Sequence, residues 1–395
     1  MKLSSKIFVG AFILLISVPF FGRLALRGTT PHMVLETENR QVTAFSALKS
    51  WRRGEMRNWF RNNDAWISDR LAKKDFVVRL TNRVLANPQL FQSTDFSRGL
   101  FGQDGFLFLG NNFCRVLDRH FLPEFQIEKV NREKLLDRHT TLKRTAELQG
   151  ASYALFVAPD KHSIFCEKLP SWMLGKNVCA NVARVTLDLL DSFKKKNIPV
   201  VFPLQTLRAK NDQTIYFKPD THWKPSGAQI GFQSLMESLT ERGIRFNGKP
   251  FASTSPDTFS FEPYQLGTDG DLRIIIGVPR DFVIDDFGLK FHCNIPVVFS
   301  ENGKPPVRLR AEEVSIRSAT TKWFGHVRNE SAPNKVRVLV FGDSFMVNMS
   351  SFFFTHFTDT HFYSFYGLET ADMKAVIQEV KPDLVIYETV ERSLF

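Results

Sequence analysis

The clearest pattern in the sequence is an alternation of short apolar runs with stretches of helical periodicity. The runs predict buried strands, and the stretches between them predict amphipathic helices. The predicted strands are Tyr153–Val157, Pro199–Phe202, Val336–Phe341, His361–Phe365 and Asp383–Tyr387, and the predicted helices are Val182–Lys195, Pro225–Glu241, Ser344–Phe354 and Glu369–Val380. Continuous apolar strands separated by helices are typical of a parallel sheet covered on both faces. We therefore predict an α/β fold with a doubly wound parallel sheet.

The alternation is interrupted between about residues 246 and 334. Strand-like pieces occur there at Leu272–Val278, Phe282–Ile284 and Pro296–Phe299. We interpret this region as a β-rich insertion between two halves of the sheet.

The part of the chain before the alternation has a different pattern. From Glu36 to about Leu90, apolar residues recur at near-helical intervals among polar ones, which predicts a helical lead over residues 31–100. Asp104-Gly105 then lies between apolar residues and predicts a hairpin with a two-residue turn. The main domain is expected to span residues 101–395.

Residues 1–30 have the pattern of an export signal. Lys2 and Lys6 precede an apolar run from Ile7 to Gly22, which Arg23 follows. No small-x-small cleavage site follows, so an uncleaved anchor in the inner membrane is favoured, although the run is shorter than the ~20 residues that span a bilayer comfortably. Cleavage and release are the alternative. Either way, the body of the protein is expected in the periplasm.

Export changes how the four cysteines are interpreted, because disulfides form and persist outside the cytoplasm. Cys166 and Cys179 are close in sequence and are the expected pair, with buried free thiols as the alternative. No Cys-x-x-Cys or Cys/His spacing indicates zinc. We therefore predict neither a metal nor a cofactor.

Composition narrows the choice of partner. The chain has 395 residues, 43% of them hydrophobic, so it can bury a large core. Its formal net charge of +11 favours a polyanion, an anionic membrane surface or nucleic acid. The basic residues are scattered and no nucleic-acid-binding signature occurs, so nucleic acid is not expected as a partner.

Gly342-Asp343-Ser344-Phe345 directly follows the apolar strand Val338–Phe341 and precedes a predicted helix. In a parallel sheet, ligands bind at the carboxyl ends of strands, and a helix that begins there directs free N–H groups toward developing negative charge. Ser344 could attack a carbonyl while its own N–H stabilises the oxyanion. The alternative is an ordinary helix cap. Met346 replaces the last glycine of a Gly-x-Ser-x-Gly elbow.

A serine nucleophile needs a base, and Asp220-Thr221-His222-Trp223 offers one. Asp220 and His222 lie two apart on a short loop, so the carboxylate could hold one ring nitrogen and leave the other for the serine proton. Taken alone, the pair could instead be a surface turn or half of a metal site.

Together these motifs resemble the alginate O-acetyltransferase branch of the SGNH hydrolase superfamily. The resemblance runs from about Asn39 to the C-terminus. It rests on the two motifs above and on the segments Gly102–Phe108, Ala158–Lys161, Gly270–Leu272 and Tyr387–Arg392. The Asp/His block precedes the Gly-Asp-Ser block and the pair is Asp-x-His, two departures from ordinary SGNH hydrolases that match this branch. Phe106 stands where the family usually has tryptophan. We do not expect the C-terminal carbohydrate-binding module that some relatives carry, so acceptor binding would fall to the catalytic domain.

The resemblance implies roles for individual residues. Ser344 would be the nucleophile and contribute its N–H to the oxyanion hole, His222 would be the general acid/base, and Asp220 would orient it. Asp343 would brace the turn. Candidate substrate-binding residues are Trp223, with a core position as the alternative, and Lys161 and Arg392, with solvated charge as the alternative.

The resemblance also implies a function. Ser344 would accept an acetyl group and pass it to a hydroxyl of an extracytoplasmic polysaccharide, and a membrane-bound O-acyltransferase would supply the acetyl group. The alternatives are a carbohydrate acetylesterase that uses the same triad and a non-catalytic scaffold of an exopolysaccharide complex.

Overall fold

The computed structural model describes residues 34–35, 40–41, 97–174, 178–210, 212–244, 250–252, 258–267, 270–278, 284–301, 304–316 and 324–394. The chain forms two compact units, one of residues 1–95 with 271–283 and a larger one of residues 96–270 with 284–395. The expected signal or anchor at 1–30 lies outside the described residues, as does most of the expected helical lead.

Within the smaller unit, β1 (Val34–Leu35) pairs with β2 (Arg40–Gln41) in antiparallel orientation. Its other described element is the helix α11 (Asp271–Ile276), so the strand expected from Leu272 is wrong. The sequence pattern misled because a short apolar run fits a strand or a buried helix equally well.

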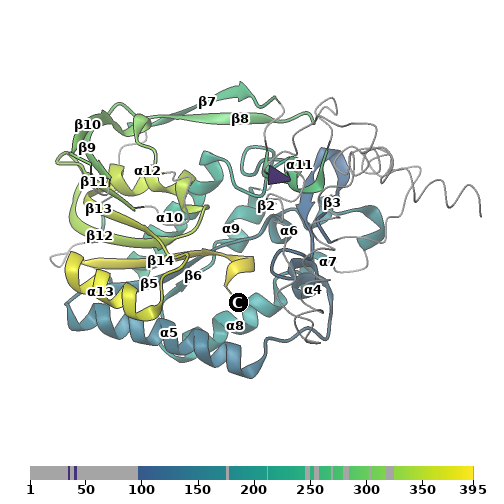
Figure 1. Ribbon diagram of the computed structural model, residues 1–395, viewed down its shortest axis with the longest axis horizontal. Helices are drawn as coiled ribbons and strands as arrows, with labels where there is room; N and C mark the ends of the chain where they lie inside the picture. Colours follow the sequence, from purple (N-terminus) through teal and green to yellow (C-terminus); the bar gives the residue numbers. More distant parts are fainter. Residues whose placement is uncertain are drawn as a thin grey trace, which may run out of the picture. The chain divides into compact units, whose positions relative to one another are not determined.

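The larger unit is built on one mixed sheet of eight strands, in the order β10-β9-β11-β13-β12-β14-β5-β6 (Figure 1). The strands are β5 (Ser152–Ala158), β6 (Val200–Val201), β9 (Pro296–Glu301), β10 (Val307–Arg310), β11 (Phe324–Arg328), β12 (Asn334–Gly342), β13 (Phe357–Ser364) and β14 (Leu384–Val390). The five strands from β13 to β6 pair in parallel, which confirms the parallel part of the prediction.

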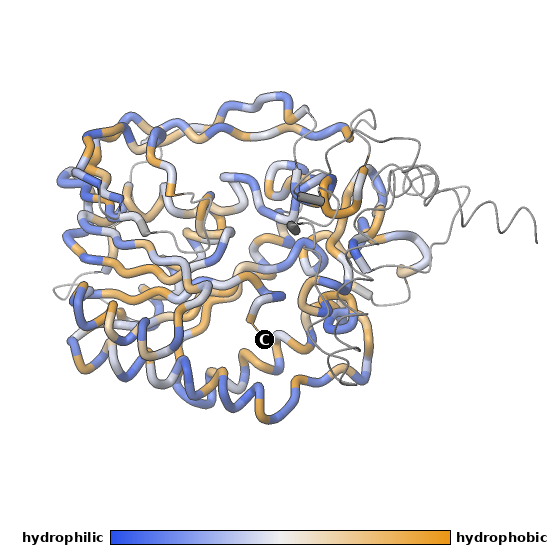
Figure 2. Tube along the Cα trace, in the orientation of Figure 1, coloured by the Kyte–Doolittle hydropathy of each residue, from blue (hydrophilic) through white to orange (hydrophobic). Residues whose placement is uncertain are grey.

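Helices cover both faces of the parallel strands (Figure 1). On one face lie α5 (Lys129–Leu148), α8 (Arg184–Lys195) and α13 (Thr370–Val380), and on the other lie α10 (Pro225–Glu241) and α12 (Met346–His356). The central strands are strongly hydrophobic (Figure 2). Their side chains form a buried core with those of α5, α8 and α13, and each fully buried large apolar side chain contributes roughly 1.5–3 kcal/mol.

The predicted β-rich region lies in the chain between α10 and β12, but three of its strands belong to the main sheet. Its strands β9, β10 and β11 extend the same sheet beyond β13 with antiparallel pairing, and β7 (Ser260–Gln265) and β8 (Phe287–His292) form a separate antiparallel pair. The strands of this extension are only partly buried, as expected for antiparallel strands that leave one face to solvent. Of the predicted piece Phe282–Ile284, only Ile284 is described, and it lies outside a strand.

The predicted hairpin is present as β3 (Gly99–Phe101) and β4 (Leu107–Leu109). Phe101 pairs with Leu107, so the connection is longer than the predicted two-residue turn. Asp104 and Gly105 still provide the reversal, with φ angles of 54° and 80°. The short elements of this unit are α4 (Val116–Phe121), α6 (Lys161–Ile164), α7 (Val178–Asn181), α9 (Leu204–Ala209), η1 (Gln103–Gly105), η2 (Cys166–Lys168), η3 (Ser171–Met173), η5 (Ala311–Glu313) and η6 (Glu391–Ser393).

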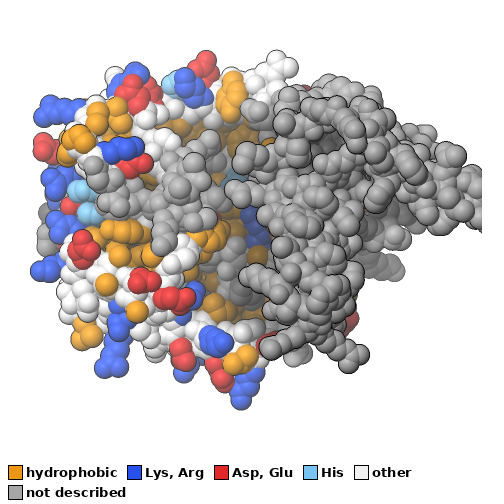
Figure 3. Space-filling view, in the orientation of Figure 1, with side chains coloured by type: hydrophobic (Ala, Val, Ile, Leu, Met, Phe, Trp, Pro, Cys, Tyr) orange, Lys and Arg blue, Asp and Glu red, His pale blue; other side chains and the backbone are white. Residues whose placement is uncertain are grey.

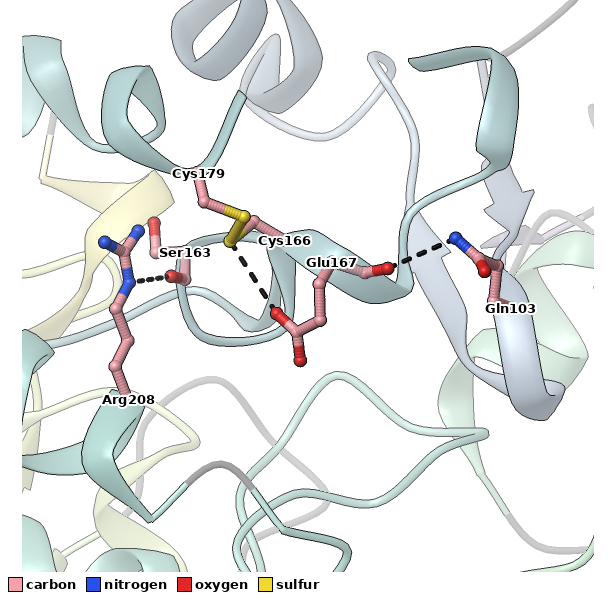
Figure 4. Close-up of a disulfide and its surroundings, with 6 residues drawn as sticks. All are labelled: Gln103, Ser163, Cys166, Glu167, Cys179 and Arg208. Carbon is pink, nitrogen blue, oxygen red and sulfur yellow. Dashed lines mark hydrogen bonds between the residues drawn. A yellow bond between two sulfur atoms is a disulfide. The ribbon is translucent and has the colours of Figure 1, made fainter. Parts of the chain in front are cut away.

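A disulfide joins Cys166 on η2 to Cys179 on α7, which confirms the expected pairing (Figure 4). Closing this short loop stabilises the fold by about 2–3 kcal/mol. The η2 segment is also held by Gln103, whose Nε2 donates to the carbonyl oxygens of Glu167 at 3.2 Å and Leu169 at 2.9 Å. The disulfide and Gln103 therefore fix this segment from two sides.

The surface of the larger unit carries charges of both signs. Lys and Arg side chains are spread over the face seen in Figure 3 and are mixed with Asp and Glu, which fits the scattered pattern in the sequence. Within the part of the chain that the structure describes, no helix is both long enough and apolar enough to cross a membrane.

Candidate active site

Ser344 lies at the carboxyl end of the parallel strand β12. The strand ends at Gly342 and α12 begins at Met346, so Ser344 is exposed in a tight turn between them. The turn requires glycine at 342, because a Cβ there would lie 2.9 Å from Cβ of Met346 and 3.0 Å from Oε2 of Glu388. The small residue thus lets the backbone close into a turn that presents the serine.

Asp343 supports this turn with hydrogen bonds from its buried side chain, as its expected structural role implies. Its buried carboxylate accepts hydrogen bonds from the N–H groups of Phe345 at 2.9 Å and Val390 at 2.7 Å. Its own N–H donates to Oε2 of Glu388 at 3.0 Å. Burial raises the pKa of Asp343, and burial together with the neighbouring Asp343 carboxylate raises the pKa of Glu388 well above its ordinary value. The two carboxyls form a buried polar support for the turn.

His222 and Asp220 lie on the loop that precedes α10. A backbone bridge between Tyr216 and Trp223 closes this loop, and the N–H of Phe217 donates to the carbonyl of His222 at 3.3 Å. Pro225 begins α10 at a favoured first-turn position. The loop geometry therefore holds Asp220 and His222 together.

Three side chains converge at the carboxyl edge of the sheet. Nε2 of His222 lies 2.7 Å from Oγ of Ser344, and Nδ1 of His222 lies 2.7 Å from Oδ1 of Asp220. The same Asp220 oxygen also accepts the N–H of His222 at 2.9 Å, which fixes the carboxylate against the ring. The His222 and Asp220 side chains are 24% and 22% exposed, so a substrate can reach the cluster. Nδ1–H donating to Asp220 would leave Nε2 free to accept the serine proton.

Trp223 is a core residue, so the expected stacking on a sugar ring is wrong. Its side chain is 0% exposed, and its Nε1–H donates to the carbonyl of Phe345 at 2.9 Å. A Cβ at Gly231 would lie 3.1 Å from its ring. Trp223 thereby links the His222 loop to the Ser344 turn.

Lys161 lies inside the fold, where neither acceptor binding nor the alternative of solvated charge applies. The residue is 2% exposed, and its ammonium donates to the carbonyls of Leu107 at 2.9 Å and Lys218 at 3.0 Å. It connects β4 to the segment that leads into the His222 loop. A lysine near the end of a strand is expected to be exposed. Nothing in the sequence indicated its burial, because its carbonyl partners lie far along the chain.

Arg392 lies beside the Ser344 turn. Its Nη1 donates to Oδ1 of Asp160 at 2.6 Å, its guanidinium carbon lies 5.3 Å from the centroid of the Phe345 ring, and its side chain is 13% exposed. Burial alone would raise the pKa of Asp160, but Arg392 and His120 lower it below its ordinary value. Arg392 thus carries a positive charge close to the turn, held there by a buried carboxylate.

Sequence reasoning did not single out Glu388 or Glu391 as functional supports. Both belong to β14 or directly follow it, and both are buried. Glu391 accepts hydrogen bonds from the N–H of Asp160 at 2.9 Å and from the hydroxyls of Ser163 at 2.7 Å and Thr186 at 2.8 Å. An available signal was the presence of two acids at the end of an otherwise apolar strand. Away from this edge, His326, Asp359 and His361 bring metal-ligating side chains together on β11 and β13.

The comparisons with known proteins agree with the motifs. Residues 100–280 match a family model described as the SGNH hydrolase-like domain of the acetyltransferase AlgX, which confirms the resemblance deduced from the sequence. The matched residues include Asp220 and His222, and Ser344 follows them in the chain.

Two curated relatives are probable alginate O-acetylases AlgJ. The one from Pseudomonas putida is 26% identical over 152 residues, which are 36% of this chain and 36% of the relative. The one from Pseudomonas fluorescens is 25% identical over 179 residues, covering 42% of this chain and 40% of the relative. The chain therefore matches well under half the length of these relatives.

A solved structure shares the fold. Bacillus cereus PatB1 superposes with a TM-score of 0.51 at 17% identity, over 68% of this chain and 92% of PatB1. This likeness concerns the fold alone.

Proposed function

We propose that this chain, which resembles the SGNH hydrolase-like acetyltransferase domain over residues 100–280, is an O-acetyltransferase that acts on an extracytoplasmic polysaccharide through an acetyl-Ser344 intermediate. The observation that carries the proposal is the line of hydrogen bonds from Asp220 through His222 to Ser344, with a distance of 2.7 Å at each step. Because one fold can host many activities, the argument depends on this geometry.

In the first half-reaction, Oγ of Ser344 would attack the carbonyl carbon of an acetyl donor while its proton passes to Nε2 of His222. Asp220 would stabilise the imidazolium that forms, because its carboxylate already accepts from the ring. The tetrahedral intermediate would then collapse, the bond to the leaving group would break, and His222 would return the proton to that group. The acetyl ester of Ser344 remains.

The oxyanion formed at each tetrahedral stage needs hydrogen-bond donors. Among the described residues, the N–H of Ser344 donates to no backbone acceptor, whereas the N–H groups of Asp343 and Phe345 are both used by buried carboxylates. The Ser344 N–H is therefore the group that would stabilise the oxyanion as charge develops. The Asp343 and Glu388 brace would keep it in place.

In the second half-reaction, a sugar hydroxyl would give its proton to Nε2 of His222 and attack the acetyl carbon. The bond from that carbon to Oγ of Ser344 would then break, His222 would return the proton to Oγ, and the O-acetyl sugar would leave. Water could do the same and would make the protein an esterase. A hydroxyl held in line has an effective concentration far above that of an untethered one, so acceptor binding decides the outcome. The net charge of +11 suits an acidic glycan.

We place the reaction in the periplasm, with residues 1–30 as an inner-membrane anchor or export signal. A membrane-bound O-acyltransferase would supply the acetyl group, as the family resemblance implies. The export pattern of residues 1–30 supports this location.

The test is the fate of the acetyl group. The purified protein is given an artificial acetyl ester with and without an alginate oligosaccharide, and released acetate and acetylated sugar are both measured. We expect slow hydrolysis alone and acetylated oligosaccharide when the acceptor is present, with transfer weakening as salt rises. Ser351→Ala, a half-buried serine on α12, is the matched control and should behave as wild type.

Efficient deacetylation of an acetylated polymer, without transfer at any acceptor concentration, would instead support the esterase. An absence of both reactions, with the protein folded, would favour the scaffold.

A further inference from the structure

A second group of reactive side chains lies away from the Ser344 edge, in the middle of two adjacent strands. His326 on β11 stands directly opposite His361 on β13 in the antiparallel register. Asp359 precedes His361 by two residues, so its side chain projects from the same face of the sheet. β11 and β13 run side by side in Figure 1.

The three side chains converge on one oxygen atom. Nε2 of His326 lies 2.7 Å and Nε2 of His361 lies 3.1 Å from Oδ1 of Asp359, and the two imidazole rings stack with centroids 4.0 Å apart. The side chains of His326, Asp359 and His361 are 15%, 16% and 14% exposed. The cluster is thus sheltered but open to a small ion.

We propose that His326, Asp359 and His361 form a binding site for a divalent transition-metal ion, with zinc as the representative ion. Two imidazole nitrogens and one carboxylate oxygen are a ligand set that suits zinc, with water in the remaining position. The three ligand atoms lie within 4.8 Å of one another.

The two imidazole rings have to turn to accept the ion, because they stack with an interplanar angle of 12° and a bound metal lies in the plane of each ring. Zinc takes ligands at about 2.0–2.2 Å in a tetrahedral arrangement, which places neighbouring ligand atoms roughly 3.3 Å apart. The two nitrogen-to-oxygen distances of 2.7 Å and 3.1 Å therefore need to widen by about 0.6 Å and about 0.2 Å.

Arg337 prepares the carboxylate for this role. Its Nε donates to Oδ2 of Asp359 at 2.9 Å, whereas both histidines approach Oδ1. Arg337 occupies the opposite position on the parallel neighbour β12. One carboxylate oxygen is thereby held by the protein and the other is directed at the histidines, as occurs where neighbouring groups orient a metal ligand.

The bound ion would join β11 to β13, which is where the antiparallel extension meets the parallel strands. No metal was predicted from the sequence. His326 and Asp359 lie 33 residues apart and form no local spacing motif. Cross-strand pairing brings them together.

The experiment measures zinc binding by the whole protein after removal of metal with a chelator. Zinc chloride is titrated by calorimetry, and zinc retained after dialysis is counted by elemental analysis. Wild type is compared with His326→Gln, His361→Gln and Asp359→Asn. We expect each variant to retain one zinc equivalent fewer than wild type, and zinc to raise the Tm of wild type but not of the variants.

His292→Gln is the matched control, because His292 also lies close to two carboxylates, at 3.0 Å from Glu262 and 3.5 Å from Glu312. It should bind zinc as wild type does. Far-UV circular dichroism confirms that each variant is folded, and cobalt(II) gives a second readout, since its visible bands should weaken in His361→Gln. Equal zinc stoichiometry in wild type and in the three variants, or no zinc bound by wild type, would show that the cluster is only a hydrogen-bonded histidine pair.

Discussion

Backbone N–H to C=O hydrogen bonds hold together both the parallel and the antiparallel part of the sheet. The two parts differ in burial and in where they place reactive side chains. In the parallel part, every residue of β14 and nearly every residue of β5 is buried, and the reactive side chains lie just beyond the strand ends. In the antiparallel part, β9 and β10 are half-exposed, and the histidine cluster lies within the strands.

The difference follows from strand direction. Parallel strands all end at one edge, so loops from distant parts of the chain meet there, and His222 reaches Ser344 across a separation of 122 residues. Antiparallel neighbours instead bring side chains together by register, as with His326 and His361. One sheet therefore brings reactive side chains together in two ways.

We expect the largest effect from substitutions at the carboxyl edge of the parallel strands, and the quantity affected is the rate of acetyl transfer. Ser344→Ala or His222→Ala should lower acetyl transfer by about 10⁴–10⁶-fold, because the nucleophile and its base act as a unit. Both side chains are partly or fully exposed, so the free energy of unfolding should change little. Steady-state transfer rates and chemical unfolding measure the two quantities. Rates within tenfold of wild type for Ser344→Ala would contradict the mechanism.

Asp220→Asn should have a smaller effect on the same rate. The substitution keeps the shape of the side chain but removes the charge that stabilises the histidinium, so we expect a loss about ten- to a hundredfold smaller than for Ser344→Ala. The measurement is again the transfer rate. A loss equal to that of His222→Ala would assign Asp220 a larger role than orientation.

Asp343→Ala tests the buried support beneath that edge. The N–H groups of Phe345 and Val390 would lose their acceptor, at a cost of about 1–3 kcal/mol each in the free energy of unfolding. Chemical unfolding measures the change. Val307→Ala, at a 51% exposed position on β10, is the control from the antiparallel part and should cost less than about 0.5 kcal/mol. Similar losses in both variants would remove the distinction between the two parts of the sheet.

The parallel part of the sheet and the helices that cover it should also make the free energy of unfolding depend on pH. Burial lowers the pKa of His139, on α5, to about 3, below its value of about 6.5 in the unfolded chain. Below that unfolded value the unfolded chain takes up a proton that the folded protein refuses, so the free energy of unfolding falls as pH drops from about 6.5 toward 3, by up to about 1.4 kcal/mol per pH unit.

His139→Gln should remove this contribution and make the pH dependence shallower. Urea unfolding at pH 7, 6 and 5 measures the slope. His162 and His356, whose pKa values burial lowers to about 3 and about 4, would maintain part of the dependence in the variant. An unchanged slope in His139→Gln would show that this histidine is protonated in the folded protein.

The parallel strands could be predicted because their apolar runs are continuous, and α10 has the expected limits, Pro225–Glu241. Apolar and polar residues alternate only weakly along the antiparallel strands. The sequence therefore indicated β structure but not where these strands lie in the sheet. α11 was mistaken for a strand because six residues are too few to separate the two periodicities.

At the candidate site, neither local motif was sufficient alone, and Ser344, His222 and Asp220 were selected because the two motifs occur together in an order that resembles a known family. Lys161 was misinterpreted, and Trp223 was left open between a sugar-stacking and a core position, because the exposure of a side chain depends on partners far along the chain. Trp223 bonds to Phe345 and Lys161 to Leu107, and neither contact has a local signature. The buried acids Glu388 and Glu391 were missed for the same reason.

The central claim is that the acetyl group passes through Ser344, and the most direct measurement is mass spectrometry of the protein after brief exposure to an activated acetyl ester. The account predicts one acetyl group on the peptide that contains Ser344. This label should be absent from Ser344→Ala, present in Ser351→Ala, and lost when an acceptor oligosaccharide is added. An acetyl group found only on other residues, or the same labelling in Ser344→Ala as in wild type, would contradict the account.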